Sequence, residues 1–228
     1  MRKKPTPFIF INSAMSADGK ISTRKRKQVR ISGALDFERV DILKASSDAI
    51  MVGIGTILSD NPSLTVKSDE RKKQRIESGI DENPVRIVVD SHARTPLDAD
   101  ILKKGKGVRI IAVSDAAPAE RVAKLSKYAK IITAGSGQVD LVKLMGILKE
   151  MGIERLMVEG GATLNWALIE AGLVDEIYTF IGNIIIGGTT APTLADGDGF
   201  GERDEVCELR LIDAEMIEEG VLLRWAVK

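Results

Sequence analysis

Short aliphatic runs alternate with helix-period segments along most of this chain, and this alternation constrains the fold more than any other feature. The aliphatic runs lie at residues 7–12, 48–55, 85–90, 108–114, 129–134, 155–160 and 174–186. Segments with apolar residues at helical spacing lie at 33–47, 117–128, 139–152 and 163–172. Parallel strands that are buried on both faces show continuous apolar runs and are joined by crossover helices. The sequence therefore predicts an α/β fold with a mostly parallel central sheet flanked by helices.

The C-terminal end departs from this alternation. Within residues 206–227, two stretches of alternating polarity surround a Glu-Gly turn, and no helical segment separates them. This pattern predicts an antiparallel hairpin at one edge of the sheet. The 228 residues suffice for one sizeable core. Residues 67–83 are charged and poor in apolar side chains, so we expect an exposed excursion within a single domain that spans residues 1–228.

Local signals predict several element boundaries. Ser32 is placed to cap a helix over residues 33–47, and Gly152 to end the helix over 139–152. Thr56 and Asp60 are four residues apart and would share one face of a helical turn. The Asn-Pro pair at 61–62 is expected to stop that turn and to release a strand.

Composition excludes several classes of function. Lys and Arg together number 33, as do Asp and Glu, so no net field favours nucleic acid or an anionic membrane. One cysteine and one histidine cannot form a zinc site, and we expect no metal. A serine hydrolase would need His92 as its base, but the chain has no G-x-S-x-G elbow. The single cysteine, with neither a signal peptide nor a run of about 20 apolar residues, indicates a cytoplasmic protein.

Polar and small residues follow the predicted strands, where open parallel sheets bind ligands. They are Asn12, the GIGT stretch at 53–56, Asp90 to His92, Ser114 with Asp115, and Glu159 to Gly161. This set suits hydrogen bonding to a nucleotide or a polar heterocycle. GIGTIL begins like a dinucleotide fingerprint, but Leu58 occupies the third glycine position, and a plain tight turn explains it equally well. EGGAT fits an amide cradle for phosphate, or a turn of small residues with a surface glutamate.

Four separated blocks together resemble a known enzyme family. They are MSADGK at 15–20, VGIGTILSDNPSLTV at 52–66, NPVRIVVDSHARTP at 83–96 and MVEGGATLNWALIEAGLVDEIY at 157–178. In this order they resemble the stand-alone archaeal and fungal pyrimidine reductases of riboflavin biosynthesis, which reduce the ribosylamino side chain of 2,5-diamino-6-ribosylamino-4(3H)-pyrimidinone 5′-phosphate. The resemblance implies a dihydrofolate-reductase-like fold, NADPH as cofactor and a homodimer. Bacterial relatives also carry a zinc deaminase, whose H-x-E…P-C-x-x-C signature does not occur in this chain.

The resemblance also implies roles for individual residues. Cofactor contacts would come from Thr56, Asp60, Ser91, His92, Arg94, Gly160, Gly161, Ala162 and Thr163. Substrate contacts would come from Asn12, Gln28, Lys44, Leu64, Lys67 and Glu159. Several relatives have arginine where Lys44 and Lys67 stand, which keeps the charge but loses the bidentate fork. The sequence nominates no catalytic proton donor.

Two alternative functions remain open from the sequence. One is another NADPH-dependent reductase of the same fold, such as a dihydrofolate reductase. Two lysines placed for a phosphate, and the lack of an aromatic-rich site for a folate, argue against it. The other alternative is a nucleotide-binding module without catalysis. A substrate panel would separate the first, and loss of NADPH absorbance with the pyrimidine substrate would exclude the second.

Overall fold

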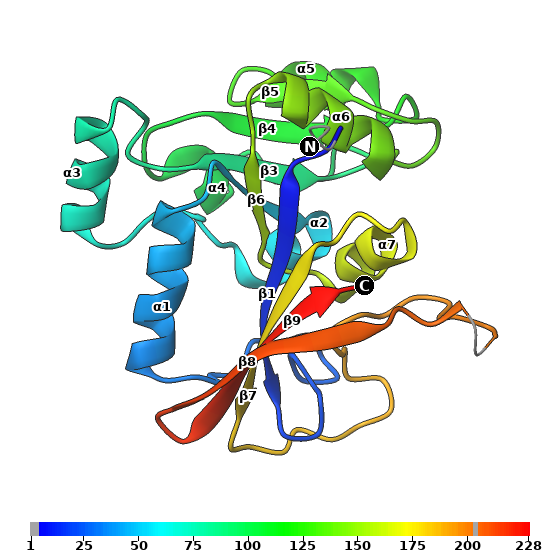
Figure 1. Cartoon of the computed structure of the whole chain (residues 1–228). Helices are drawn as coiled ribbons and strands as arrows, with labels where there is room; N and C mark the ends of the chain where they lie inside the picture. The colour runs from blue at the N-terminus through cyan, green and yellow to red at the C-terminus, as the bar shows by residue number, and fades with distance from the viewer. Residues whose placement is uncertain (1–4, 203–204) are drawn as a thin grey trace. The chain divides into compact units, whose positions relative to one another are not determined.

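The computed structural model of the protein describes residues 5–202 and 205–228, and these residues divide into two compact units (Figure 1). The first unit comprises Asp41–Met157 together with the N-terminal residues up to Phe8. The second comprises Ile9–Val40 and Val158–Lys228. The boundary at Asp41 falls within helix α1 (Ala34–Ala45). Each unit is described by itself.

The first unit is built on parallel strands in the order β5-β4-β3-β2-β6. They are β2 (Ala49–Gly53), β3 (Val85–Val89), β4 (Arg109–Val113), β5 (Lys130–Thr133) and β6 (Arg155–Val158). The pairs β2–β3, β3–β4 and β4–β5 are all parallel. Side chains on both faces, such as Ile50, Met51, Ile110 and Ile111, are fully buried. The aliphatic runs therefore form the predicted doubly covered parallel sheet.

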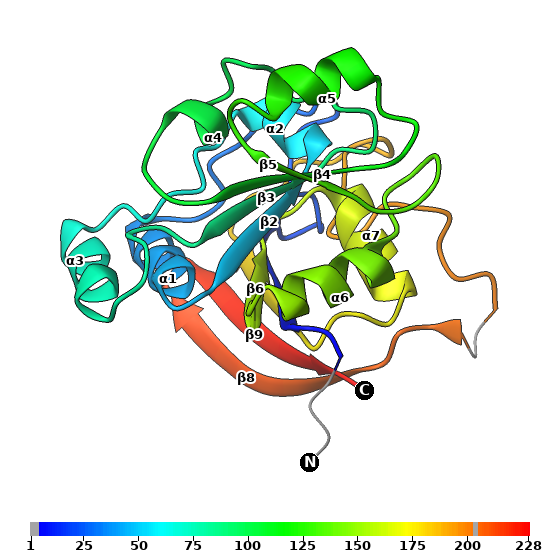
Figure 2. The same ribbon diagram turned by 90° about the horizontal axis from the view of Figure 1, so that it is seen from above.

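Helices cover both sides of these strands. They are α2 (Ile54–Asp60), α3 (Asp69–Glu77), α4 (Asp100–Lys103), α5 (Ala119–Leu125) and α6 (Leu141–Glu150). In Figure 2, α2 and α5 lie on one side of β3, β4 and β5, and α6 lies on the other. The carboxylate of Asp140 accepts the N–H of Lys143 at 2.9 Å and caps α6. The predicted stop at Gly152 has φ +86°, a conformation that glycine adopts without steric cost.

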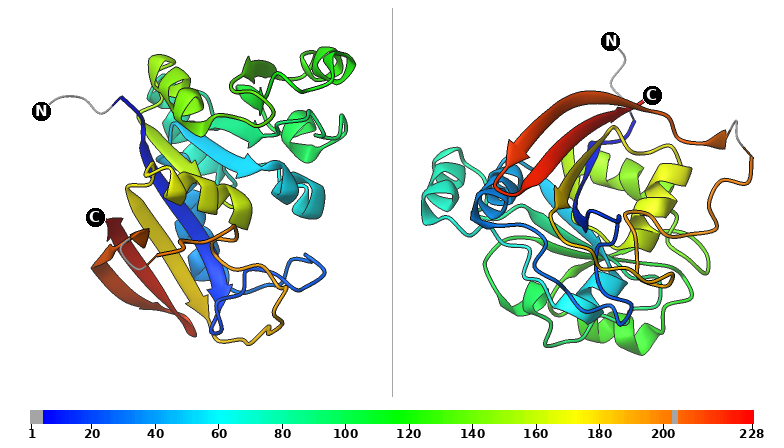
Figure 3. Two further views of the ribbon diagram at one scale, coloured as in Figure 1. Left: turned by 90° about the vertical axis from the view of Figure 1, so that its right-hand side faces the viewer. Right: turned by 90° about the horizontal axis from the view of Figure 1, so that it is seen from below.

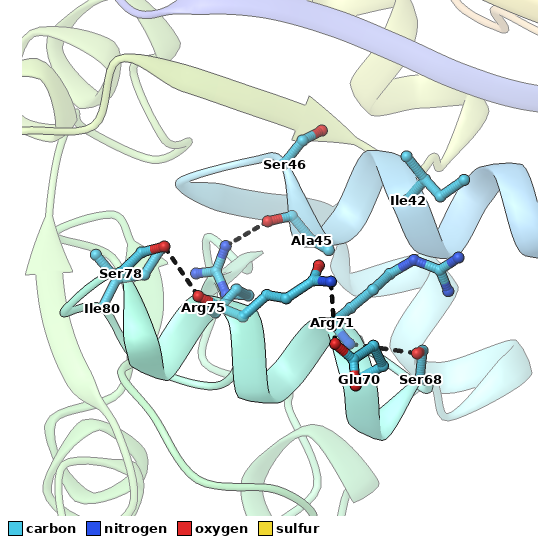
Figure 4. A pocket seen from close by; sticks show the side chains of 10 residues that line it. Ile42, Ala45, Ser46, Ser68, Glu70, Arg71, Arg75, Ser78 and Ile80 are labelled. Carbon is cyan, nitrogen blue, oxygen red and sulfur yellow. Dashed lines mark hydrogen bonds between the residues drawn. The ribbon is translucent and has the colours of Figure 1, made fainter.

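The charged stretch 67–83 is mostly exposed, as the sequence predicted, and it contains helix α3. Ser68 caps this helix by accepting the N–H of Arg71 at 3.3 Å. Arg75 points into the unit, and its guanidinium donates to the carbonyl of Ala45 at 2.6 Å (Figure 4). It also donates to the carbonyl of Ser47 at 3.1 Å. The carbonyl of Ala45 stands at the end of α1, where no further helical turn supplies an N–H donor for it. The buried arginine therefore attaches α3 to the end of α1.

The strand expected after the Asn-Pro pair does not form. Asn61 does end α2, in a left-handed conformation with φ 44° and its N–H bonded to Ile57. The chain from 61 to 68 then has no strand assignment, and Leu64 adopts φ +53°. Its backbone N–H groups bond to side chains instead of a neighbouring strand. The amide oxygen of Asn83 accepts the N–H of Val66 at 2.9 Å, and the carboxylate of Asp41 accepts those of Lys67 and Ser68.

A fully buried arginine on β3 holds the loops beside this segment. The guanidinium of Arg86 donates to the carbonyls of Lys104 at 2.6 Å and Lys106 at 3.1 Å, and lies 3.4 Å from that of Ser63. Burial and the charge of Arg109 lower its pKa to about 10, so it stays charged at neutral pH. One buried cation therefore satisfies carbonyls of loops that lie far apart in sequence.

The second unit has the strand order β1-β7-β9-β8. Its elements are β1 (Phe8–Ser16), α7 (Ala162–Glu170), β7 (Glu176–Gly182), β8 (Leu209–Ile217) and β9 (Gly220–Val227). β1 and β7 pair in parallel, whereas β9 runs antiparallel to both β7 and β8. Figure 3 shows the hairpin of β8 and β9 beside β7. The predicted C-terminal antiparallel hairpin is confirmed.

The predicted cap at Ser32 is wrong. Helix α1 begins at Ala34, two residues later, and the N–H of Leu35 bonds to the carboxylate of Glu218 at 3.3 Å. A Cβ atom at Gly33 would lie 2.0 Å from that carboxylate, so only glycine allows this approach. A negative charge from the β8–β9 turn thus stands at the positive end of the helix.

The α/β class, with parallel strands, flanking helices and a C-terminal antiparallel hairpin, is confirmed within these units. In the part of the chain that the structure describes, no helix is both long and apolar enough to cross a membrane.

Replacing Arg86 by methionine should lower the free energy of unfolding by about 2–4 kcal/mol, because several buried carbonyls would lose their donor. Urea denaturation followed by circular dichroism measures this change. Lys73→Met is the matched control, because it removes the same charge from a side chain that is 68% exposed, and it should change stability by less than about 0.5 kcal/mol. Equal effects of the two substitutions would show that Arg86 does not hold these loops.

Candidate functional site

In the first unit, Thr56 and Asp60 stand on α2, which directly follows the carboxyl end of β2. The predicted helical turn is confirmed, and the spacing of four residues puts both side chains on one face. Thr56 is half-buried, whereas Asp60 is exposed. The side chain of Asn61, which ends this helix, accepts the N–H of Asp100 at 2.8 Å. A hydroxyl and a carboxylate are therefore presented together on a short helix with an anchored end.

The loop after β3 holds Ser91, His92 and Arg94 in a turn with a buried base. Asp90 is fully buried, and its carboxylate accepts both the N–H and the hydroxyl of Thr95, at 2.7 and 2.8 Å. The guanidinium of Arg121 donates to the carbonyl of Thr95 from α5 at 2.7 Å. These hydrogen bonds hold the two ends of the turn, Asp90 and Thr95, together and attach Thr95 to α5.

The three predicted cofactor residues of this loop differ in their surroundings. His92 is exposed, and the side chain of Arg94 is 56% exposed, 3.9 Å from the carboxylate of Asp90. Ser91 is half-buried, and its hydroxyl accepts the N–H of Val139 at 3.1 Å. The loop therefore offers an imidazole and a guanidinium to solvent on a fixed backbone. A guanidinium on such a loop suits an anionic group.

Lys67 belongs to a cluster of cations in the first unit. Its ammonium donates to the hydroxyls of Ser63 at 3.0 Å and Thr65 at 2.9 Å. Partial burial lowers the pKa of Lys67, and the charge of Lys44 lowers it further, with Asp41 opposing and Lys104 and Lys72 adding to the effect. Leu64, the third substrate residue predicted here, is buried within the segment that carries Lys67. The structure thus brings Lys44 and Lys67 close enough to repel each other, as expected of a site for a doubly charged anion.

In the second unit, the turn from Glu159 into α7 has the backbone of an anion cradle. Gly160 and Gly161 adopt φ +112° and +99°, conformations that other residues rarely adopt. α7 begins at Ala162, and no side chain caps it at Gly161. A Cβ atom at Gly160 would meet nothing within 4 Å, so the backbone conformation, and not crowding, demands glycine. Uncapped N–H groups at a helix start fit a phosphate group, and this turn therefore fits the pyrophosphate of a dinucleotide.

A neighbouring loop supports this helix start. The side-chain amide of Asn165, which is fully buried on α7, donates to the carbonyl of Leu194 at 2.8 Å. The N–H of Asp196 bonds to the carbonyl of Ala162 at 3.1 Å, and its carboxylate accepts the hydroxyl and N–H of Thr193. Residues 193–196 therefore hold Ala162, beside Thr163, in place. Thr163 itself is exposed on the first turn.

Asn12 and Gln28 lie in very different environments. Asn12 is buried on β1, and its side-chain oxygen accepts a bond from the guanidinium of Arg39 at 2.9 Å. Arg39 is in turn held by the buried carboxylate of Asp36 at 2.7 Å. Gln28 is exposed in a loop outside the regular elements. Arg39 fixes the orientation of the Asn12 side chain, whereas the side chain of Gln28 extends into solvent.

The chain matches the sequence profile of the RibD C-terminal domain over residues 7–223. It belongs to the RibD C-terminal domain family. The match covers almost all of the described residues in both units, including every predicted cofactor and substrate residue.

Two reductases from archaea are similar to this chain over nearly their whole length. A protein from Archaeoglobus fulgidus named 2,5-diamino-6-ribosylamino-4(3H)-pyrimidinone 5′-phosphate reductase is 48% identical, over 94% of this chain and 95% of the relative. A protein of the same name from Methanothermobacter thermautotrophicus is 44% identical, over 97% and 99% of the two chains.

Solved structures give the same fold. A pyrimidine reductase-like protein from Corynebacterium diphtheriae superposes with a TM-score of 0.81 at 18% identity, over 97% of this chain and 92% of that chain. Dihydrofolate reductase from Enterococcus faecalis superposes with a TM-score of 0.50 at 12% identity, over 97% and 96%. At these identities the likeness concerns the fold alone, and it confirms the predicted dihydrofolate-reductase-like class.

The sequence did not single out two residues that shape these sites. Asp41 and Asn83 accept N–H groups of the segment that carries Lys67. Asp90 was predicted only as a strand-end residue, and the structure shows that its carboxylate holds Thr95. An aspartate at a strand end with a threonine five residues later, as at Asp90 and Thr95, is a local pattern from which this contact could have been predicted. No local pattern links Asp41 to Lys67, because 26 residues separate them.

Two further observations limit the site. Within residues 5–202 and 205–228, no group of three or more His, Cys, Asp or Glu side chains could hold a metal ion. A hollow of about 680 Å³ between α1 and α3 is lined by residues that include Ile42, Ser68, Arg71 and Ile80 (Figure 4). None of the residues predicted to bind cofactor or substrate lines it, so we assign it no role in binding either of them.

Asp18, in the MSADGK block, fastens the chain that follows β7. Its carboxylate accepts the N–H groups of Ile186 at 3.0 Å and Gly187 at 2.7 Å, and the hydroxyl of Ser16 at 2.6 Å. The bond from Ser16, followed by that from Ile186, lowers the pKa of Asp18 to about 2. The chain turns at Asp18 and Gly19, directly after β1.

The amide protons of Ile186 and Gly187 should therefore keep their hydrogen-bonded chemical shifts at pH 3 and lose them as the pH falls through about 2. A lowered folded pKa means that this contribution is present above the unfolded value and is lost on acidification through the folded value. Nuclear magnetic resonance over a pH titration measures the midpoint. Asp18→Asn should abolish the transition, and a wild-type midpoint near the ordinary value of 3.8 would show that these bonds do not hold the carboxylate.

Proposed function

We propose that this protein is the NADPH-dependent reductase that converts the ribosylamino side chain of 2,5-diamino-6-ribosylamino-4(3H)-pyrimidinone 5′-phosphate to the ribitylamino form in riboflavin biosynthesis. The observation that carries this proposal is the 48% identity, over 95% of its length, to a relative with that reductase name. The cation pair of Lys44 and Lys67 agrees with a phosphorylated substrate. The uncapped glycine turn at the start of α7 agrees with a dinucleotide cofactor.

We propose that the cofactor residues divide by the part of NADPH that they contact. Thr56 and Asp60 would bind a hydroxyl or amide group, because together they offer a donor and an acceptor. Ser91, His92 and Arg94 would line the adenosine half, with Arg94 as the partner of the 2′-phosphate. The backbone from Gly160 to Thr163 would hold the pyrophosphate, which the N–H groups at the start of α7 favour.

We propose that the substrate residues act on two ends of the molecule. Lys44 and Lys67 would bind the phosphate, with Leu64 contacting the substrate from the same segment. Glu159, half-buried after β6, would accept hydrogen bonds from the amino groups of the pyrimidine, since an ionised carboxylate only accepts. Asn12 and Gln28 would provide further polar contacts, of which only Asn12 has a fixed orientation in the structure.

The proposed chemistry needs orientation more than a reactive side chain. When bound, NADPH would supply a hydride from C4 of its nicotinamide to C1′ of the ring-opened ribose in its imine form, and a proton from solvent would go to the imine nitrogen to complete the amine. Lys44 and Lys67 would fix the phosphate end of the open chain, and Glu159 would fix the heterocycle at the other end. Each fixed group limits the conformations of the bound substrate, which converts an encounter into a positioned reaction.

A spectrophotometric assay tests this function directly. Purified protein with NADPH and the ribosylaminopyrimidine phosphate should consume NADPH absorbance in proportion to substrate, and the product should carry two additional hydrogens by mass spectrometry. Dihydrofolate and the deaminated pyrimidine serve as comparison substrates. Turnover of dihydrofolate alone would assign a different reductase activity, and NADPH binding without turnover of any substrate would assign a binding module.

We propose that the whole chain acts as one cytoplasmic reductase domain and assembles into a homodimer. A single domain family matching residues 7–223 supports the first part. The edge strand β8 supports the second, because Leu209, Leu211, Ile212 and Met216 are 37–82% exposed on it. An apolar edge strand with unpaired backbone groups is a ready surface for association.

Met216→Lys should therefore weaken the dimer, because it places a charge on the apolar strand. Light scattering should give about twice 24.7 kDa for the wild type and a mass near 24.7 kDa for the variant at low micromolar concentration. Val142→Lys on α6 is the matched control, with a side chain that is 57% exposed, and it should remain dimeric. A monomeric wild type, or a Met216→Lys dimer as stable as the control, would contradict association through β8.

Glu159→Gln should weaken substrate binding by about 2–4 kcal/mol, because one acceptor oxygen becomes a donor and a substrate amino group loses its partner. NADPH affinity should change little, since the backbone of Gly160 and Gly161 remains. Two calorimetric titrations, one with cofactor and one with substrate, separate these effects. If cofactor affinity collapses while substrate affinity holds, Glu159 belongs to the nucleotide site.

A further inference from the structure

The segment that carries Lys67 is held in place by buried side chains. Between Ser63 and Ser68 the chain belongs to no strand, and Leu64 stands at φ +53°. A backbone in this state keeps a single conformation only if its surroundings determine it. The N–H of Val66 bonds to Asn83, which is 1% exposed, and those of Lys67 and Ser68 bond to Asp41, which is 6% exposed.

Asp41 makes the most direct connection to Lys67. One carboxylate oxygen accepts the N–H of Lys67 at 2.6 Å, and the other accepts the N–H of Ser68 at 3.0 Å. The second oxygen also accepts a bond from the guanidinium of Arg71 at 3.0 Å. Asp41 lies on α1, three residues before Lys44. The same helix turn therefore carries one predicted phosphate ligand and fixes the backbone of the other.

The carboxylate of Asp41 is charged and fully occupied. Burial alone would raise its pKa, but the bonds from Lys67, Ser68 and Arg71 outweigh burial and lower it. Both oxygens are committed to donors within the first unit. Figure 4 shows Arg71 on α3 beside the end of α1. Because its oxygens bond to backbone N–H groups and to Arg71, this carboxylate stabilises the fold and does not compete with an incoming anion for the ammonium group of Lys67.

The ammonium group of Lys67 is also oriented. Of its three N–H donors, two are directed to the hydroxyls of Ser63 and Thr65, at 3.0 and 2.9 Å. The third donor remains for an anion. Neighbouring cations at Lys44, Lys104 and Lys72 oppose a charge at this position, and Asp41 is the group that supports it. Without an anion, the arrangement is electrostatically costly, so other contacts must hold it together.

We propose that Asp41 is the positioning residue of the substrate-phosphate site, which holds Lys67 beside Lys44 before the substrate arrives. This inference rests on the proposed function, because it takes Lys44 and Lys67 as the phosphate ligands. Asp41 touches neither substrate nor cofactor in this account. It acts through the backbone of Lys67 and Ser68, so its contribution is pre-organisation of the cation pair.

Asp41→Asn tests the proposal, because it keeps the shape of the side chain and turns one acceptor into a donor that faces a backbone N–H. The Michaelis constant for the phosphorylated substrate should rise about tenfold or more, and that for the dephosphorylated substrate should stay within about twofold. The turnover number with saturating phosphorylated substrate should be nearly unchanged. Inhibition by inorganic phosphate against the dephosphorylated substrate should weaken by the same factor of about ten.

Asp69→Asn is the matched control. Asp69 lies two residues after Lys67 and pairs with Lys72, but its side chain is 95% exposed and bonds to no backbone N–H of residues 66–68. Asp69→Asn removes the same charge near the same lysines as Asp41→Asn does. It should leave both Michaelis constants within about twofold of their wild-type values. Should Asp41→Asn lose the native circular dichroism spectrum, Asp41→Ser replaces it, because a hydroxyl still accepts one of the two N–H groups.

The outcomes separate this proposal from the proposed function. A wild-type protein that binds inorganic phosphate by calorimetry but does not reduce the pyrimidine would contradict the proposed function. Phosphate titrations of Asp41→Asn and Asp69→Asn would then still test the proposal for Asp41, because only Asp41→Asn should weaken phosphate binding. Equal losses in Asp41→Asn and Asp69→Asn would assign the effect to bulk charge and overturn the proposal. Equal losses with phosphorylated and dephosphorylated substrates would assign Asp41 a purely structural role and would also overturn it.

Discussion

Parallel pairing of strands buried on both faces is the constraint on which the first unit depends. Strands β2 to β5 satisfy their backbone groups in the ladder, but the chain that leaves them must find partners elsewhere, because buried N–H and C=O groups are costly when unpaired. Here the partners are buried side chains: Asp90 for the turn after β3, and Asp41 with Asn83 for the segment after α2. The same loops carry the residues proposed to bind ligands.

This arrangement joins stability and function physically. The guanidinium of Arg86 donates to carbonyls of the loop at 104–106 and lies close to the carbonyl of Ser63, so one buried side chain joins that loop to the start of the segment that carries Lys67. Removing one partner of such a buried hydrogen bond costs more free energy of folding than the bond itself contributes, because the other group is left buried without a partner. A change at Arg86 or Asp41 is therefore expected to affect residues that are proposed to contact ligand, although neither of the two is proposed to contact it. In the second unit, Asn165 and Asp196 do the same for the start of α7.

The sequence predicted what depends on periodicity and turn chemistry. The strands, the covering helices, the hairpin and the end of α2 at the Asn-Pro pair follow from local patterns, and the structure confirms them. The failures arose where distant side chains replaced local partners. Glu218 supplies a carboxylate for the start of α1 in place of Ser32, although 186 residues separate the two in sequence. After Pro62, Asn83 accepts the N–H of Val66 and Asp41 accepts those of Lys67 and Ser68, in place of a neighbouring strand. Of the site, the strand-end positions were predictable, and their buried supports were not.

The central claim is that NADPH bound by this chain reduces one carbon of the sugar side chain, with the substrate held at its phosphate and at its heterocycle. The most direct measurement is a single-turnover reaction with NADPH deuterated at the transferring position of C4, followed by mass spectrometry and nuclear magnetic resonance of the product. The account predicts one deuterium at C1′ of the ribityl chain and none in the pyrimidine ring. Deuterium in the ring, or a reduced product without deuterium from either C4-labelled form, would contradict it.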